Sequence, residues 1–402
     1  MNIFSYQPPT AGWPIYLRDV FGGFFLRGKF EDDLKSYLRL PYARVVTSGT
    51  AAFYLILESL KNISAKKRVI IPSYTCPLVP LAIERACLKT QVCDIEDNSF
   101  DFDSAALEKI CAEGDVLAIV ATHLAGLPVG LDKISALAKR YGIYLIEDCA
   151  QALGAKYKDR PVGSWGDFSF FSLCRGKGLT IYEGGVVVAK EQAMWNLFEN
   201  QFEKVMKNSF LQEALKIAEV FGYWVFYRPQ LFWFVFGLPQ WFWKAVGKES
   251  RAYLEEYDLN FPLYRVSGFR KNIAHAAFGR LQEQTRQQRE KASIYIEGLS
   301  SVGGVKVIKE SDFAAASYPY LVVIFDDIIR RNKAMDVLLS RGVGASLIYT
   351  NAITDYNFLS KFVPQTNPLN GRRMAQATLI LSTGIFMDKS RIKLIPELFK
   401  QI

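Results

Sequence analysis

Residues 143–151 read IYLIEDCAQ, a short apolar run that ends in two adjacent carboxylates. A run of this length is typical of a strand buried on both faces of a parallel sheet. The carboxyl ends of such strands border the ligand crevice of an open α/β sheet, so we expect Asp148 to face that crevice. There its carboxylate can pair with a protonated ring nitrogen. Taken alone, Asp148 is better explained as the cap of the next helix.

The same texture recurs on both sides of this stretch, from about Asp32 to Val188, in alternation with helical periodicity. Residues 68–72 and 116–121 are further apolar runs, while residues 51–60 and 131–141 have helical spacing. Alternation of this kind predicts an α/β domain with a mostly parallel sheet.

The sequence changes character near Glu191. Residues 191–219 read as polar helix, and residues 220–243, VFGYWVFYRPQLFWFVFGLPQWFW, hold four of the chain's seven tryptophans. Further on we expect two helices, at 271–300 and 329–341, and three strands, at 319–325, 344–349 and 378–382. The predicted domains are a large α/β domain, a helical aromatic-rich insertion and a smaller α+β domain, over residues 1–190, 191–264 and 265–402.

Composition excludes several classes of protein. Of the 402 residues, 50% are hydrophobic and 22% are charged, so the chain is too apolar to be disordered. The net charge of +9 lies mostly beyond Lys244 and suits a phosphorylated substrate or an anionic membrane surface. The sequence has no run of five like charges and no nucleic-acid-binding motif, so we expect no nucleic-acid partner.

Cysteine and histidine usage indicates a reducing compartment. The six cysteines form no CxxC pair, and two histidines cannot complete a zinc pattern. We expect no metal site, and reduced thiols that pack as core residues. The first residues, MNIFSYQPPTAG, lack the basic start and apolar core of a signal peptide, so we expect a cytoplasmic protein.

A second segment of chemical interest is residues 47–52, TSGTAA, where a loop turns into the helix expected at 51–60. Small residues let a phosphate approach the backbone, and the free N–H groups at the positive end of a helix would hold it. An ordinary helix cap is the simpler explanation when the segment is taken alone.

A third segment, residues 169–180, places Lys177 among small residues on a loop between two short strands. Lysine amines form Schiff bases with aldehydes, and desolvation or a cationic neighbour such as Arg175 lowers their pKa enough for them to react. An isolated lysine would most often be an ordinary surface residue.

In this order and spacing the three segments resemble the pyridoxal-phosphate (PLP) aminotransferases of fold type I, and more narrowly the DegT–StrS family of sugar aminotransferases. The resemblance runs from about Gly28 to Val188 and resumes more loosely from Phe269 to the C-terminus. It implies a large domain with a mostly parallel sheet and a smaller α+β C-terminal domain. The matching segments are SGTAA (48–52), IPSYTCPLVPLAI (71–83), HLAGLPVGLDKI (123–134), IEDCAQALGA (146–155), VGSWGDFSFFS (162–172), Lys177 and EGG (183–185).

The resemblance also implies roles for individual residues. Lys177 would hold PLP as a Schiff base and then move the proton between the substrate carbon and the cofactor carbon. Asp148 would keep the pyridine nitrogen protonated, which makes the ring an electron sink. Gln151 would lie near the phenolic oxygen of the ring, and the phosphate would be held by Gly49, Thr50, Ala51 and Ser172. In the dehydratases of the family a histidine stands in place of the lysine, so Lys177 favours transamination.

The chain departs from the family pattern at several positions. Cys76 falls where an aromatic residue usually stacks on the cofactor ring, and Tyr74 is a candidate to compensate. Gly268 replaces an Asn that reaches the phosphate of the neighbouring subunit. Ile348-Tyr349 and Ser382-Thr383 replace a small-domain histidine and a late Leu-Pro. PLP binding survives these changes more easily than the identity of the substrate does.

Three more residues have competing explanations. His123 matches a frequent family histidine, and a hydrogen-bonded structural role is favoured over a catalytic one. Arg270 can bind a substrate phosphate bidentately or be a solvated helix-end arginine. Arg175 is a second candidate for substrate contact.

The leading functional prediction is a PLP-dependent aminotransferase that moves an amino group from glutamate to a nucleotide-linked keto-sugar, in amino-sugar and polysaccharide biosynthesis. By analogy with the family we expect a homodimer. A non-catalytic or regulatory relative is a further alternative, against which the intact Lys177 and Asp148 argue.

The aromatic stretch 220–243 motivates another alternative, a lipid-linked or other hydrophobic carbonyl substrate used at a membrane surface. Its two apolar runs, 220–227 and 231–238, would rise only about 12 Å each as helices, against roughly 30 Å for a bilayer core. We therefore expect peripheral contact with the inner face of a membrane. Packing within a dimer or against the insertion's own helices is nearly as good an explanation.

Overall fold

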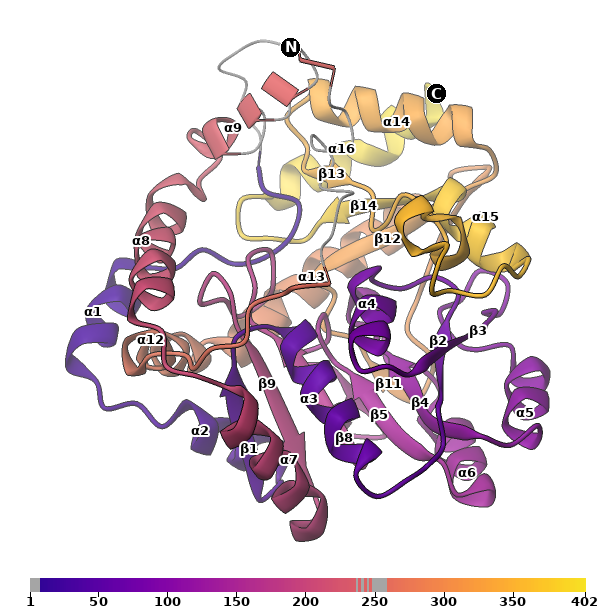
Figure 1. The fold of residues 1–402 in the computed structure, drawn as a ribbon. Coiled ribbons are helices and arrows are strands. Elements are labelled where there is room, and N and C mark those ends of the chain that lie inside the picture. Colours follow the sequence, from indigo (N-terminus) through magenta and orange to yellow (C-terminus); the bar gives the residue numbers. More distant parts are fainter. Residues whose placement is uncertain (1–7, 236–237, 240–241, 244–245, 248–258) are drawn as a thin grey trace.

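The structure is a computed structural model that describes residues 8–235, 238–239, 242–243, 246–247 and 259–402 (Figure 1). Its centre is a seven-stranded sheet in the order β1-β9-β8-β5-β4-β2-β3. The strands are β1 (Tyr42–Val46), β2 (Arg68–Pro72), β3 (Lys89–Cys93), β4 (Val116–Thr122), β5 (Tyr144–Asp148), β8 (Phe168–Ser172) and β9 (Gly185–Ala189). Only β9 runs against the others, pairing antiparallel with β1 and β8. The mostly parallel sheet expected from the sequence, and fold type I with it, are confirmed.

Helices cover both faces of this sheet, which is why its strands are apolar almost throughout. Neighbouring residues of β2 alternate between two hydrophobic clusters, with Val69 and Ile71 in one and Ile70 in the other. The first face packs against α3 (Gly49–Lys61), α4 (Leu78–Arg85) and α7 (Gln192–Val205). The second packs against α2 (Phe30–Leu38), α5 (Ser104–Ala112), α6 (Leu131–Tyr141) and α12 (Gly268–Phe278).

The C-terminal part of the chain builds a second, antiparallel sheet in the order β10-β12-β14-β13. Its strands are β10 (Val305–Val307), β12 (Tyr320–Phe325), β13 (Ala345–Ser346) and β14 (Thr378–Ser382). The helices around it are α13 (Leu281–Leu299), α14 (Ile328–Ser340), α15 (Leu369–Ala377) and α16 (Lys389–Lys400). A small third sheet joins β11 (Ala314–Ala315) to β6 (Lys156–Tyr157) and β7 (Arg160–Pro161), and so ties this part to the central sheet's connections. The domain limits at residues 190 and 264 stay a prediction.

Two expected elements differ from those observed. The single helix expected over 271–300 is two helices, α12 and α13, which separate at Gly279 and Arg280. Glycine is a poor helix former, and the two helices pack in different places, α12 on α1 (Leu17–Phe25) and α13 on α16. The strand expected over 344–349 is shortened to Ala345–Ser346. No local pattern records the separate packing partners of α12 and α13.

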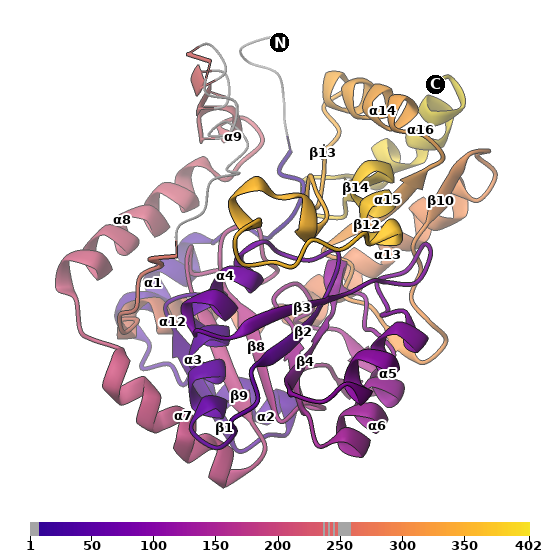
Figure 2. The same cartoon turned by 45° about the vertical axis from the view of Figure 1, so that its right-hand side comes forward.

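The expected polar helix and aromatic stretch form α7, α8 (Phe210–Phe226) and α9 (Phe232–Val235), with α8 and α9 lying along one side of the molecule (Figure 2). Tyr223 and Tyr227 are buried, whereas Phe226 and Phe234 are exposed. Residues 236–237 and 240–241 of the stretch 220–243 lie outside the described residues. Within the part of the chain that the structure describes, no helix is both long enough and apolar enough to cross a bilayer.

Candidate active site

Four of the central strands bring polar and small residues to one edge of the sheet. β1, β5 and β8 end there, and the antiparallel β9 begins there, so Ser48, Asp148, Ser172 and Gly185 meet although up to 137 residues separate them. Residues at the carboxyl ends of parallel strands form the usual ligand crevice of an α/β sheet. The candidate site lies at this edge.

The N-terminus of α3 enters the edge as a close-packed turn. Ser48 caps the helix, its Oγ accepting from the N–H of Ala51 at 3.1 Å. A Cβ on Gly49 would come 3.2 Å from Cβ of Ser172, and one on Gly185 would clash with the carbonyl oxygen of Ser48. A side chain at position 185 would therefore push the start of α3 away from β9, whereas at position 49 it would make a tight contact with Ser172 of β8.

This turn fits an anion such as a phosphate group. The N–H groups of Gly49 and Thr50 stand in the first turn of α3, where no intrahelical acceptor exists, and the helix dipole adds positive potential. The hydroxyl of Ser172 faces the same space and accepts only a long bond, 3.4 Å, from the N–H of Cys174. The N–H of Ala51, also predicted to hold phosphate, is instead bonded to Ser48.

The two adjacent carboxylates at the end of β5 take opposite directions. Glu147 is fully buried in the interior and accepts hydrogen bonds from His123, Ser169 and the N–H groups of Gly163, Trp165 and Gly166. Burial acts to raise the pKa of Glu147, but these bonds outweigh it and hold the pKa below its ordinary value. Glu147 is thus a structural anion, and Asp148 is the carboxylate left for the crevice.

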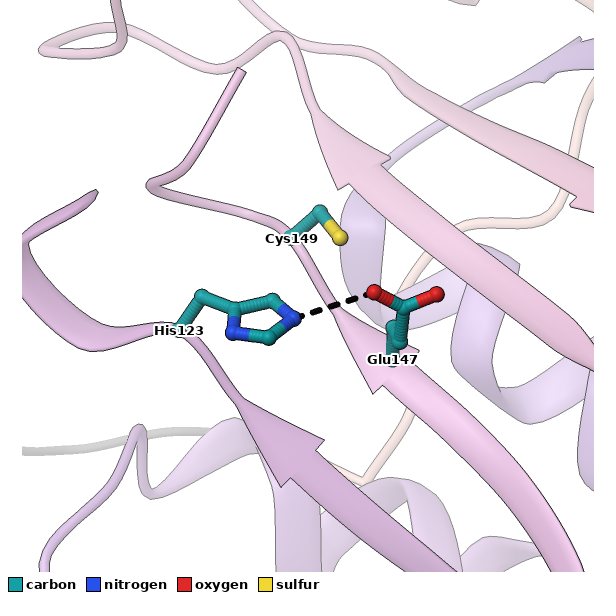
Figure 3. Close-up of side chains that lie close together, drawn as sticks. All are labelled: His123, Glu147 and Cys149. Carbon is teal, nitrogen blue, oxygen red and sulfur yellow. Dashed lines mark hydrogen bonds and ion pairs between the residues drawn. The ribbon is translucent and has the colours of Figure 1, made fainter. Parts of the chain in front are cut away.

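His123 belongs to this structural group, as Figure 3 shows. Its Nδ1 accepts from the N–H of Val129 at 3.2 Å, so its Nε2 carries the proton and donates to Glu147 Oε2 at 3.1 Å. Cys149 lies close enough to complete a set of three potential metal ligands. Both histidine nitrogens and both carboxylate oxygens already have partners, so hydrogen bonding accounts for the cluster. The expectation of a hydrogen-bonded structural histidine is confirmed.

Asp148 is 5% exposed and accepts a hydrogen bond from the N–H of Ala150 at 3.0 Å. Burial raises the pKa of Asp148, and the bond from Ala150 and the nearby charge of Lys177 partly offset that rise. A buried carboxylate of this kind is stabilised by a cation placed against it. A protonated ring nitrogen would be such a cation.

Lys177 lies half-buried on the loop between β8 and β9, as expected. Its positive charge acts to lower the pKa of both Asp148 and Cys76. The loop is held from an unexpected side, since the N–H of Trp13 donates to the carbonyl oxygen of Lys177 at 3.3 Å. A Cβ on Gly12 would come 2.6 Å from Cα of Gly176, so the N-terminal segment around Gly12 packs directly against the loop. No short-range pattern links residues 12 and 176.

Gln151 also lies at the site, and two of its hydrogen-bond partners come from the C-terminal part of the chain and were not singled out as a group in the sequence. Its amide contacts the hydroxyl groups of Tyr320 and Tyr349. Tyr74 does not replace the missing ring-stacking residue at Cys76. Its ring stacks on Phe100 and its hydroxyl donates to the carbonyl oxygen of Tyr349 at 3.0 Å. Recognising this group from sequence requires pairing residues more than 160 positions apart.

The structure contradicts the substrate-binding prediction for Arg270. The side chain has no exposed surface, and its guanidinium group is bonded to Glu213 of α8 and to the carbonyl oxygen of Glu183. A guanidinium without exposed surface, bonded through each of its three nitrogens inside the protein, cannot bind a substrate phosphate. Arg175 is exposed, with its guanidinium 5.8 Å from the ring of Tyr182, so substrate contact stays a prediction there.

The prediction that all cysteines pack as core residues is wrong for part of the set. Cys93, Cys111 and Cys149 are buried, and all six thiols are free. Cys87 is exposed, because it stands in a turn after α4 with a φ of 53°. Cys76 and Cys174 are half-buried at the site's edge.

Comparison with known proteins agrees with this geometry. The model of the DegT/DnrJ/EryC1/StrS aminotransferase family matches residues 25–222 and 247–397. The chain belongs to this family. Membership confirms the family predicted from the sequence, and with it the predictions of an enzyme, an aminotransferase, and of PLP as its cofactor.

Individual members of the family resemble the chain to different extents. GDP-perosamine synthase of Escherichia coli O157:H7 is 33% identical over 168 residues, 42% of this chain and 46% of the synthase. The chain thus matches less than half the length of that relative. The solved structure of the sugar aminotransferase CalS13 from Micromonospora echinospora has a TM-score of 0.76 at 19% identity, covering 98% of this chain and all of that one. DesI, solved in the presence of its TDP-sugar product, has a TM-score of 0.75 at 20% identity, covering 99% and 93%.

Proposed function

We propose that the chain is a PLP-dependent aminotransferase that transfers an amino group from glutamate to a nucleotide-linked keto-sugar. One observation supports the proposal: the buried carboxylate of Asp148 lies within reach of the charge of Lys177, at the sheet edge where α3 begins. These are the groups needed to hold the three functional ends of the cofactor, its aldehyde, ring nitrogen and phosphate. The glycines at 49 and 185 let the start of α3 pack closely against β8 and β9.

Each residue has a separate task in this proposal. The bound cofactor supplies an electron sink for the negative charge that develops on the substrate carbon. Asp148 keeps the ring nitrogen protonated, because a buried carboxylate without a cation is costly. Lys177 would hold the cofactor through its amine, and the same amine, when free, would carry a proton between the substrate and cofactor carbons. Ser172 and the α3 turn hold the phosphate.

The substrate class is supported by the relatives. The names of two of them refer to a GDP-linked sugar and a TDP-sugar product, and both belong to sugar metabolism. The basic charge of the C-terminal part suits a substrate with a diphosphate group. We propose a diphosphate-linked keto-sugar on this basis.

The test of the proposal has two steps. Purified protein incubated with PLP should gain a visible absorption band, and borohydride followed by peptide mass spectrometry should find the cofactor on Lys177. The loaded protein should then convert a panel of nucleotide-linked keto-sugars, with glutamate as donor, into amino-sugars. A protein that never gains the band would be a non-catalytic relative, and one with the band but no product from the panel would have another substrate.

A second candidate, a lipid-linked keto-sugar used at a membrane surface, is favoured by one observation. Along α8 and α9, large apolar side chains are exposed: Phe210, Leu211, Leu215, Val225, Phe226, Phe234 and Val235. Residues of this kind insert at the level of lipid headgroups when no protein covers them. Liposome flotation tests the contact: the chain should float with anionic vesicles, and a folded Trp233→Ser, Phe234→Ser variant should stay at the bottom. A variant that loses its oligomeric state instead would show that these side chains pack against protein.

We further propose that the chain is a homodimer, as expected for the family. The apolar face of α1 supports this, since Leu17, Phe21, Phe24 and Phe25 are 49–80% exposed. Exposed apolar clusters of this density usually lie in an interface. Light scattering after gel filtration should give twice the mass of the chain, and Phe21→Ser with Phe25→Ser should halve it.

A further inference from the structure

Both the oxygen and the nitrogen of the Gln151 side-chain amide are hydrogen-bonded to the protein. Its Oε1 accepts from the backbone N–H of Ala125 at 2.9 Å and from the hydroxyl of Tyr320. Its Nε2 donates to the hydroxyl oxygen of Tyr349 at 3.1 Å. A backbone N–H can only donate, so the amide oxygen must face Ala125 and the amide nitrogen must face away. The orientation of the amide is therefore determined by its partners.

The partners come from both sheets of the molecule. Gln151 and Ala125 follow β5 and β4 of the central sheet, whereas Tyr320 begins β12 and Tyr349 follows β13 of the C-terminal sheet. Ala125 has a φ of 57° in the short turn Leu124–Gly126, and this conformation directs its N–H at Gln151. The hydrogen bonds to Gln151 therefore all form only where the two sheets meet.

Tyr349 is itself held in place. Its backbone N–H donates to the hydroxyl of Tyr74 at 3.2 Å, and the hydroxyl of Tyr74 donates back to its carbonyl oxygen at 3.0 Å. Its side chain lies close to Cys76, and Cys76 in turn lies near the charges of Lys177 and Asp148. Tyr349, bonded to Gln151, thus lies beside Cys76, the position where the family usually carries the ring-stacking aromatic residue.

The amide nitrogen of Gln151 has two hydrogens, and Tyr349 takes one. In the described part of the chain no second acceptor bonds this nitrogen. We propose that Tyr320 and Tyr349 are positioning residues, which orient Gln151 so that its remaining N–H is offered to the phenolic oxygen of the cofactor ring. This inference rests on the proposed function. Under this inference residues of the C-terminal part influence the charge on the cofactor ring. No sequence motif in that part indicates such a role.

The inference predicts a shift of definite sign. The phenolic oxygen shares its negative charge with the protonated imine that joins PLP to Lys177. When the imine loses its proton, that oxygen keeps the whole charge and gains more from a hydrogen-bond donor. A donor at this oxygen therefore lowers the pH at which the visible band converts, and disordering the donor raises it. One neutral hydrogen bond corresponds to a rise of about half a unit to one unit.

The experiment compares three tyrosine-to-phenylalanine variants of the PLP-loaded protein. Tyr320→Phe and Tyr349→Phe remove the two hydroxyls that bond Gln151. Tyr295→Phe is the control, since Tyr295 is also wholly buried in the C-terminal part and its hydroxyl donates to the carbonyl oxygen of Ser382 at 3.0 Å, away from Gln151. Absorbance titration should place the midpoints of the first two variants above those of wild type and Tyr295→Phe. All three should unfold at similar temperatures.

A second set of variants shows whether the tyrosines act through Gln151. Gln151→Leu should raise the midpoint at least as much as either tyrosine variant. In that background Tyr320→Phe and Tyr349→Phe should add nothing, because residues that act as one unit are not additive. If the two variants shift the midpoint no more than Tyr295→Phe does, or add fully to Gln151→Leu, the positioning role is wrong while the proposed function stands. If wild type never gains the band, both are wrong.

Discussion

Replacing Arg270 with methionine distinguishes a structural arginine from a substrate-binding one. In the structure Arg270 has no exposed surface, and its Nε donates to Glu213 Oε2 at 3.1 Å. A further bond joins it to the carbonyl oxygen of Glu183, at the end of the loop that bears Lys177. Arg270→Met keeps most of the side-chain volume and leaves the carboxylate of Glu213, only 8% exposed, without its cation.

The size of the effect follows from that burial. Breaking a buried ion pair by removing one partner costs about 3–5 kcal/mol, because an uncompensated charge stays behind. We expect the lower part of this range, since the N–H of Ser267 still donates to Glu213 at 2.8 Å. An unfolding entropy of about 2.1 cal/mol/K per residue converts 3 kcal/mol into a fall in Tm of roughly 4 °C for a chain of this length.

The assay is urea and thermal unfolding of Arg270→Met, Glu213→Leu and the double variant. Each single variant should be destabilised, and the double variant should recover much of the loss because no buried charge remains. The KM for substrate, measured on the folded variants, should change by less than tenfold, although the free energy of unfolding falls. The structural role would be refuted if KM rose tenfold or more while the free energy of unfolding stayed within about 0.5 kcal/mol of wild type. Arg270 would then be a substrate-binding residue.

The same pair predicts a pH dependence. Burial acts to raise the pKa of Glu213, but the hydrogen bond and charge of Arg270 outweigh it, so the folded-state pKa lies below the ordinary 4.5. A lowered carboxyl pKa means that the unfolded state takes up the proton first. The pair's contribution to stability is therefore present above pH 4.5 and is lost as the pH falls through the folded-state pKa. The difference in free energy of unfolding between wild type and Glu213→Leu should therefore become smaller as the pH falls through that range.

Three further predictions concern the cofactor site. Lys177→Ala should lose turnover and the visible band that borohydride removes, and a reducible lysine–PLP adduct that persists in the variant would contradict the assignment. Asp148→Asn should still bind PLP while kcat falls by orders of magnitude, since the ring nitrogen is no longer kept protonated; steady-state rates within tenfold of wild type would exclude that role. Gly185→Ala should weaken PLP binding at least tenfold by fluorescence titration, because the new Cβ displaces the start of α3, whereas Gly178→Ala, with nothing within 4 Å of its Cβ, should not; equal affinities would show that the turn does not hold the phosphate.

Much of the central sheet could be predicted from local patterns. The helix expected over 131–141 is α6, and the strand expected over 68–72 is β2. Both elements pack against the core, α6 on β4 and β5, so their periodicity reports directly on which face is covered. The break between α12 and α13 was missed because both halves are good helix, and only their different packing partners separate them.

The candidate site divides in the same way. Lys177, Asp148 and the turn at Ser48 stand next to strand ends, and the topology of a parallel sheet brings strand ends to one edge. Arg270 was misassigned because its sequence neighbours say nothing of Glu213, which reaches it from α8 57 residues earlier. The tyrosines around Gln151 were missed for the same reason.

By itself the sequence determined the α/β class, the family and the order of the groups that would hold the cofactor, since each is written in short segments whose burial and spacing are local. Only the tertiary structure decided the direction of each side chain where distant segments meet. Adjacent Glu147 and Asp148 are alike in sequence, yet Glu147 is bonded by five donors of the interior, whereas Asp148 lies near the charge of Lys177. Hydrogen-bond donors from residues far along the chain make that choice, because a buried carboxylate is stable only where such donors converge on it.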